Sequence, residues 1–264
     1  MAHPGVGLVE DSQGNIFYTD LVHVWKVHSD GQKTIAVRNA HTHELALDAQ
    51  DNLYGEDLVY EGEAVNRWHH RIWKCAPDGQ VTDLFGQRSE FRQYYGFARD
   101  RRGVQYWIQH DGKTTLIRKR TPEGTVTTIH PKMSFPRLNW IAVSPDGSVL
   151  YVTTGNRLYK ISTEGMVTEG MVTVLIDYKS TNRHAMMRIW PAPDGSVYVA
   201  NFANRTVDRV EANGKVTTIT RTEIPWSPSA MLRARNGTLW ILEYSATNEA
   251  RLKRIDAAGK TSIF

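Results

Sequence analysis

The segment HELALDAQDNLYGED, residues 43–57, places a histidine before two short apolar runs and two acids after them. The polar stretch between the runs is typical of a turn, so the segment predicts a β-hairpin. Such a hairpin would bring His43 and Asp57 to the same edge of a sheet. His41 precedes His43 by two residues, and side chains two residues apart in an extended segment point the same way.

Two chemistries are open to these groups, and the first is a metal site. Neutral imidazole together with carboxylate or amide oxygens would hold one divalent cation, either calcium, zinc or manganese. The cation would polarise a carbonyl group or activate water for hydrolysis. The predicted metal ligands are His43, Asp57, Asn139 and Glu243.

The second chemistry is a metal-free lyase. Either His43 or His184 would remove a proton beside Tyr95, while Arg137 holds a carboxylate group of the substrate. For each histidine the competing interpretation is a hydrogen-bonded residue of the core or of a loop. For Asp57 it is a strand-end carboxylate that bonds the backbone of the next loop.

Further side chains are predicted to border the same site and to contact the substrate. Trp68 belongs to LVYEGEAVNRWHH, residues 58–70, which is predicted to be the longest loop between strands and to overhang the site after Asp57. The predicted substrate-binding residues are His41, Trp68, Trp226 and Ser229.

The elements that must position these residues form an internal repeat. In each repeat an apolar strand, a polar turn and an alternating strand are followed by a second hairpin, which makes four antiparallel strands. Stacking such small sheets around an axis covers both faces of each, so an all-β, six-bladed β-propeller is predicted as one domain. The turn positions are Gly14, Asp51, Gly103, Gly147, Gly195 and Gly237, and the approximate blades are 1–38, 39–90, 91–132, 133–180, 181–222 and 223–264.

The point at which the repeat begins and ends along the chain affects how the ring of blades closes and where the site lies. The first blade starts with an inner strand and the last ends with an outer strand, so closure is predicted to rest on side-chain packing. Inner strands of a propeller line a central funnel, where the candidate residues are expected to gather. The duplicated TEGMV sequence at 163–172 predicts a lengthened outer hairpin in blade 4.

Composition and missing motifs exclude several other classes. With 264 residues, 41% hydrophobic, the chain can form a globular core, and it has neither a long apolar run nor an export leader. The net charge is +4, but the densest basic groups, RDRR at 99–102 and RKR at 118–120, are short, so no nucleic-acid partner is expected. The lone Cys75 favours the cytoplasm, although a processed periplasmic or secreted protein also fits. No P-loop, GxGxxG, GxSxG or HExxH motif indicates a nucleotide cofactor or a known nucleophile.

Three stretches, LDAQDNLYGED, SPDGSVLYVT and APDGSVYVANFANRTVDRV, resemble six-bladed propellers of the senescence-marker-protein/gluconolactonase family and of NHL-repeat proteins. The resemblance to the gluconolactonase-like enzymes implies a divalent metal held by a Glu, two Asn and an Asp that precede inner strands. Asn139 matches one Asn, whereas Val6, Tyr95 and Met187 occupy the other positions. Propeller lyases that cleave peptidyl-hydroxyglycine hold zinc by histidines at this position, and His43 matches one of them.

The sequence therefore predicts a soluble propeller that acts on a small molecule. The predicted activity is metal-assisted hydrolysis of a lactone-like or sugar-derived substrate. A non-catalytic propeller that binds a ligand or a peptide is the competing class, and the histidine-based lyase is the third.

Overall fold

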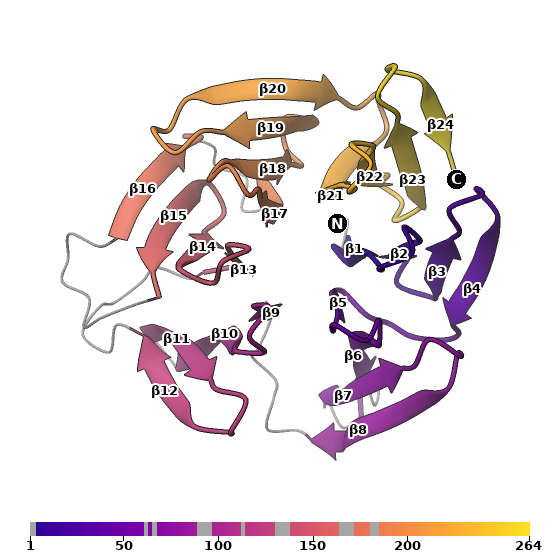
Figure 1. The fold of residues 1–264 in the computed structure, drawn as a ribbon, viewed down its shortest axis with the longest axis vertical. Helices are drawn as coiled ribbons and strands as arrows, with labels where there is room; N and C mark the ends of the chain where they lie inside the picture. The colour runs from indigo at the N-terminus through magenta and orange to yellow at the C-terminus, as the bar shows by residue number, and fades with distance from the viewer. Residues whose placement is uncertain are drawn as a thin grey trace. The chain divides into compact units, whose positions relative to one another are not determined.

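A computed structural model shows six sheets of four antiparallel strands, so the predicted six-bladed β-propeller is confirmed (Figure 1). The structure describes residues 4–60, 63–64, 68–88, 97–111, 114–129, 138–163, 172–179 and 185–264. Within these ranges no helix could span a membrane. Every sheet consists of four consecutive strands, and each lies within one of the predicted blade ranges.

The chain divides into two compact units, Met1–Arg92 with Ser229–Phe264, and Gln93–Pro228. Blades 1, 2 and 6 belong to the first unit, apart from the first two residues of β21, and blades 3, 4 and 5 to the second. The strands of the first group are β1 (Leu8–Glu10), β2 (Ile16–Thr19), β3 (Val24–Val27), β4 (Lys33–Val37), β5 (Leu45–Leu47), β6 (Leu53–Tyr60), β7 (Trp68–Cys75), β8 (Val81–Arg88), β21 (Ser227–Arg233), β22 (Leu239–Tyr244), β23 (Ala250–Ile255) and β24 (Thr261–Ile263). Those of the second are β9 (Phe97–Arg99), β10 (Gln105–Asp111), β11 (Thr114–Arg120), β12 (Val126–Ile129), β13 (Trp140–Val143), β14 (Val149–Thr153), β15 (Arg157–Ser162), β16 (Val172–Asp177), β17 (Met186–Pro191), β18 (Val197–Asn201), β19 (Thr206–Val210) and β20 (Val216–Arg221).

The predicted turn positions share one backbone conformation. All six have a positive φ, between 59° at Asp51 and 84° at Gly103. Glycine adopts this left-handed conformation without steric cost, and Asp is among the residues that tolerate it best. At Asp51 the carboxylate also accepts the N–H of Ser12 at 2.9 Å from the neighbouring blade. Asp51 therefore forms the turn of blade 2 with its backbone and contacts blade 1 with its side chain.

The hairpin of β6 and β7 is longer than predicted. Residues 58–60 and 68–70 were expected in a loop, but they extend the two strands, and Tyr60 pairs with Trp68 at the end of the ladder. The prediction of a loop over 58–70 was therefore wrong at both ends, 58–60 and 68–70. The physical reason is that aromatic and β-branched residues on both sides favour strand pairing over a solvated loop. The duplicated TEGMV segment lies outside the described residues except for its first and last residues.

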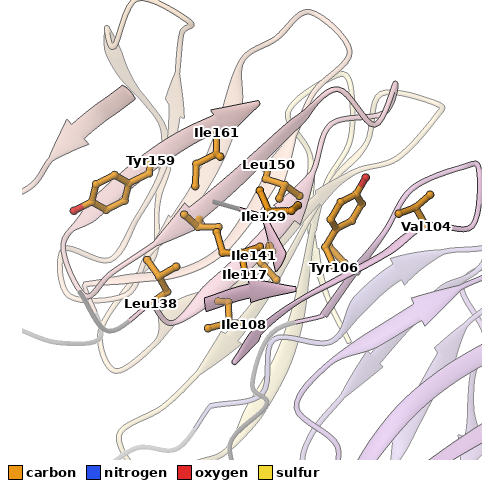
Figure 2. Packing of buried hydrophobic residues seen from close by; sticks show 12 residues of the cluster. Val104, Tyr106, Ile108, Ile117, Ile129, Leu138, Ile141, Leu150, Tyr159 and Ile161 are labelled. Atoms are coloured by element: carbon orange, nitrogen blue, oxygen red, sulfur yellow. The ribbon is translucent and has the colours of Figure 1, made fainter. Parts of the chain in front are cut away.

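Apolar side chains between neighbouring sheets form the core. In the second unit, Ile108 and Ile117 of blade 3 pack with Ile141 and Leu150 of blade 4, and none of the four is more than 1% exposed (Figure 2). In the first unit, Trp73 of blade 2 is fully buried in a cluster with residues of blade 1. Within each unit, neighbouring blades thus bury apolar faces against each other, as expected for a repeat whose small sheets are stabilised by their neighbours.

Among the described residues, blades 6 and 1 exchange no strand, as predicted, and each sheet consists of four consecutive strands. Instead, the Tyr244 hydroxyl donates to the carbonyl oxygen of Thr19 at 2.9 Å, and Tyr244 is fully buried. Burial raises the pKa of Tyr244, so its hydroxyl stays a neutral donor. On the turn side, the Arg235 guanidinium donates to the carbonyl oxygens of Asp11 at 2.6 Å and Ser12 at 3.1 Å. Side chains that bond to the neighbouring backbone therefore join the first and last blades.

Candidate functional site

The segment that carries His41 and His43 is held by backbone hydrogen bonds from two directions. On one side, the N–H of Val6 donates to the His43 carbonyl at 2.7 Å, and the Thr19 hydroxyl donates to the Thr42 carbonyl at 2.8 Å. On the other, the N–H of His41 donates to the Asp57 carboxylate at 2.9 Å. The segment is not itself a strand, since β5 begins at Leu45, but its position is determined by blade 1 and by β6.

The two imidazole rings lie against each other. Their centroids are 5.0 Å apart and their planes meet at 69°, which confirms that the side chains point the same way. His43 is 9% exposed, whereas His41 is half-buried. The arrangement therefore consists of one imidazole accessible to solvent and a second, more buried imidazole behind it.

Asp57 lies where the hairpin returns to this segment. The ladder of the hairpin ends where Leu45 pairs with Gly55, and beyond it Asp57 contacts the segment through the backbone N–H of His41. The second carboxylate oxygen of Asp57 forms an ion pair with the Arg71 guanidinium at 3.0 Å. The same guanidinium lies 3.6 Å from the Asp83 carboxylate. Asp57 thus anchors the main chain of His41 while its charge is balanced by an arginine on the next strand.

Glu243 in blade 6 repeats this pattern. Its side chain is fully buried, and Arg251 donates to the carboxylate at 2.5 Å. Both pairs join directly opposite residues of the second and third strands of a blade, Asp57 with Arg71 and Glu243 with Arg251. Sequence reasoning missed the two arginines. The signal that could have found them is the hairpin register, which sets an arginine across from each acid.

The other predicted site residues have separate surroundings. Ser229 is fully buried and donates its hydroxyl to the Leu242 carbonyl at 3.3 Å. Trp226 belongs to the turn before β21, where its N–H donates to the Glu223 carbonyl at 2.8 Å. Asn139 precedes β13 and donates its N–H to the Thr153 carbonyl at 2.7 Å.

Four predicted residues have side chains outside the described part of the structure. Trp68 has a described backbone in β7, not in the expected loop, but its side chain falls outside. Tyr95, Arg137 and His184 lie outside the described residues altogether. The histidine and aspartate groups of blade 2 therefore carry the description of the site.

The described residues do not fit the metal centre that the family resemblance implies. Two of the positions that would supply oxygen ligands are Val6 and Met187, which are apolar and at most 2% exposed. In the second predicted ligand set, Asp57 and Glu243 each form an ion pair with an arginine, which competes with a cation for the same oxygens. Among the described residues, no cluster of three or more His, Cys, Asp or Glu is arranged to hold a metal ion.

No protein-family model and no curated protein matches the chain. Solved structures match its fold. Streptogramin B lyase shares 16% identity, covering 100% of this chain and 84% of its own, with a TM-score of 0.61. A gluconolactonase from Xanthomonas campestris shares 16% identity over 91% of this chain and 83% of its own, with a TM-score of 0.68. Regucalcin from Agrobacterium tumefaciens, described as a calcium-binding protein, shares 18% identity over 91% of this chain and 82% of its own, with a TM-score of 0.64.

These similarities establish a shared fold. The predicted resemblance to six-bladed propellers of the senescence-marker-protein/gluconolactonase family is thereby confirmed at the level of architecture. The same fold carries lyase and lactonase activities in these proteins, so function has to be argued from the site of this chain.

Proposed function

We propose that this protein is an enzyme that acts on a small polar molecule, lactone-like or sugar-derived, with the His41–His43 pair as its proton-transferring group. The observation that carries the proposal is the contact between the two rings, 5.0 Å apart, in a segment held by blade 1 and by Asp57. A catalytic base needs a fixed position and a pKa near neutrality, and imidazole is the side chain that ordinarily provides both.

The proposed step is the opening of a lactone ring by water. The more exposed ring, His41, accepts a proton from water while the water oxygen bonds to the lactone carbonyl carbon. The carbon–oxygen ring bond then breaks, and the imidazolium returns the proton to the departing alkoxide. His43 packs against His41 from the buried side and restricts its orientation. The products are one hydroxyl and one carboxylic acid, so all atoms balance.

The chemistry of the site favours an imidazole over a metal as the activating group. Asp57 and Glu243 are engaged by Arg71 and Arg251, and Asp57 has a second task in binding the main chain of His41. The bond from the His41 backbone N–H to Asp57 fixes the position of the segment that carries the imidazole. We therefore derive no step through a metal ion.

The test is proton release from a panel of aldonolactones, measured at constant pH for the wild type and for His41→Gln. General base catalysis contributes about 100-fold or more, so kcat should fall by at least that factor in the variant. His23→Gln is the control, because His23 has an ordinary loop contact in which its ring nitrogen accepts the N–H of Asn39. The control should retain full activity.

Three outcomes would overturn the proposal or one of its parts. Wild-type protein that turns over none of the lactones would overturn the substrate class. Equal activity of the wild type and His41→Gln would remove the histidine from the mechanism. Activity that disappears after dialysis against a chelator and returns with calcium, zinc or manganese would overturn the metal-free step.

A further inference from the structure

A cavity of about 300 Å³ lies between the turns of blades 1 and 6, at the opposite end of the sheets from His41 and His43. Blade 1 contributes the turns on either side of Gly14 and Gly31, and blade 6 contributes Arg235, Trp240 and Arg254. Gly14 and Gly31 have positive φ, and a Cβ atom built on either would meet nothing within 4 Å. The two turns therefore leave the opening unobstructed.

Arg254 supplies a positive charge to this cavity. Its guanidinium carbon lies 5.7 Å from the centre of the Trp240 ring, so the group is held over the indole face. Its Nε atom is buried and has no hydrogen-bond partner, and Arg254 forms no ion pair with any described residue. A buried donor without an acceptor is costly, and a bound anion would supply the missing acceptor.

The other two charged residues that line the cavity, Glu10 and Arg235, pair with each other. The Glu10 carboxylate accepts the backbone N–H of Arg235 at 3.1 Å and lies 3.8 Å from the Arg235 side-chain Nε atom. Arg235 also donates to the backbone of blade 1, so its guanidinium is occupied by the closure of the ring. His28 bonds the Thr34 hydroxyl at 2.9 Å through Nε2. Arg254 thus remains the cation whose charge no neighbouring acid balances among the described residues.

We infer that this cavity binds a small oxyanion, a carboxylate or a phosphate, with Arg254 as the charged donor. The volume is at the lower end of the range for small-molecule sites. Its walls come from residues 10–31 and 234–254, so a bound anion contacts the first and the last blade together. Binding therefore stabilises the junction at which the two ends of the chain meet, and it does so independently of the proposed hydrolase site.

Thermal unfolding in inorganic phosphate, with ionic strength held constant by sodium chloride, tests the inference. The melting temperature of the wild type should rise by roughly 5 to 10 °C when phosphate reaches about 100 times its dissociation constant. Arg254→Gln should show no rise. Arg221→Gln removes an exposed arginine from β20 and should behave like the wild type.

A parallel titration with benzoate distinguishes the two forms of the ligand. A larger rise in melting temperature with benzoate favours a carboxylate ligand, and a larger rise with phosphate favours a phosphate ester. Either result supports the site when the rise is absent in Arg254→Gln. The same rise in all three proteins would show a general salt effect and overturn the inference. So would the absence of a rise with either anion in the wild type. Should Arg254→Gln fail to fold, calorimetric titration of Arg254→Met with phosphate replaces it, and affinity equal to the wild type would overturn the role of Arg254.

Discussion

Substituting Gly55 by alanine tests the packing that positions the site. Gly55 lies in β6 directly opposite Trp73 of β7. A Cβ atom on Gly55 would lie 2.1 Å from Cζ2 and 2.6 Å from Cε2 of the Trp73 ring. Carbon atoms in contact are about 3.5 Å apart or more, so the indole would have to move by more than about 1 Å. Trp73 is fully buried in the core shared with blade 1, which leaves no room for that movement.

The expected loss for Gly55→Ala is about 1 to 3 kcal/mol in the free energy of unfolding, the usual cost of an added methyl group in a packed core. For a chain of this length this corresponds to a fall of roughly 2 to 12 °C in melting temperature. Urea titration and thermal unfolding measure both quantities. Gly79→Ala is the control, because it has a positive φ of 90° but nothing within 4 Å of the added atom, and it should lose about 1 kcal/mol from backbone strain alone.

A double-mutant cycle separates the clash from other effects. Trp73→Phe removes the ring atoms that the new Cβ would meet, so it should recover about 1 kcal/mol or more of the Gly55→Ala loss, and it should show no coupling with Gly79→Ala. The reasoning is refuted if Gly55→Ala is as stable as the wild type, or if the losses from Gly55→Ala and Trp73→Phe simply add.

Two further predictions concern charged side chains. Arg251→Met removes the cross-strand cation of the buried Glu243 carboxylate, so urea titration should show a loss of about 3 kcal/mol in the free energy of unfolding. Arg209→Met is the control, because it breaks a more exposed ion pair with Asp194 and should cost far less. Equal losses in the two variants would contradict this prediction. The Ser196 hydroxyl lowers the pKa of Asp194 to about 2, so the stabilisation by this carboxylate is complete above the ordinary aspartate pKa of about 4 and is lost as the pH falls to about 2. The melting-temperature difference between the wild type and Asp194→Asn should shrink over that interval, and a constant difference would contradict the assignment.

Local patterns in the sequence were sufficient to predict the fold. The six turn positions recur in the sequence, and all have the left-handed backbone that the pattern requires, including Asp51 in place of glycine. The spacing of His41 and His43 was sufficient to predict that their side chains point the same way, and the structure adds that the two rings are in contact. These features depend on a few neighbouring residues and on the alternation of side chains along an extended chain, so no knowledge of distant segments is needed.

The tertiary structure alone decided how the charges of the site are paired. Asp57 and Glu243 were considered as metal ligands because composition shows an acid but not its partner, whereas the hairpin register sets Arg71 and Arg251 across from them. The length of the β6–β7 hairpin likewise depended on cross-strand pairing that begins beyond Asp57.

The cavity beside Arg254 likewise could not be predicted from the sequence, because it joins segments from the two ends of the chain. Its walls join residues 10–31 with residues 234–254, and no local pattern links segments more than 200 positions apart. The sequence by itself therefore determined the repeat, its turns and the direction of the histidines, because these are short-range properties of the backbone. The contact of blade 6 with blade 1 determined the cavity and the pairing of Glu10 with Arg235, because these depend on how whole sheets pack.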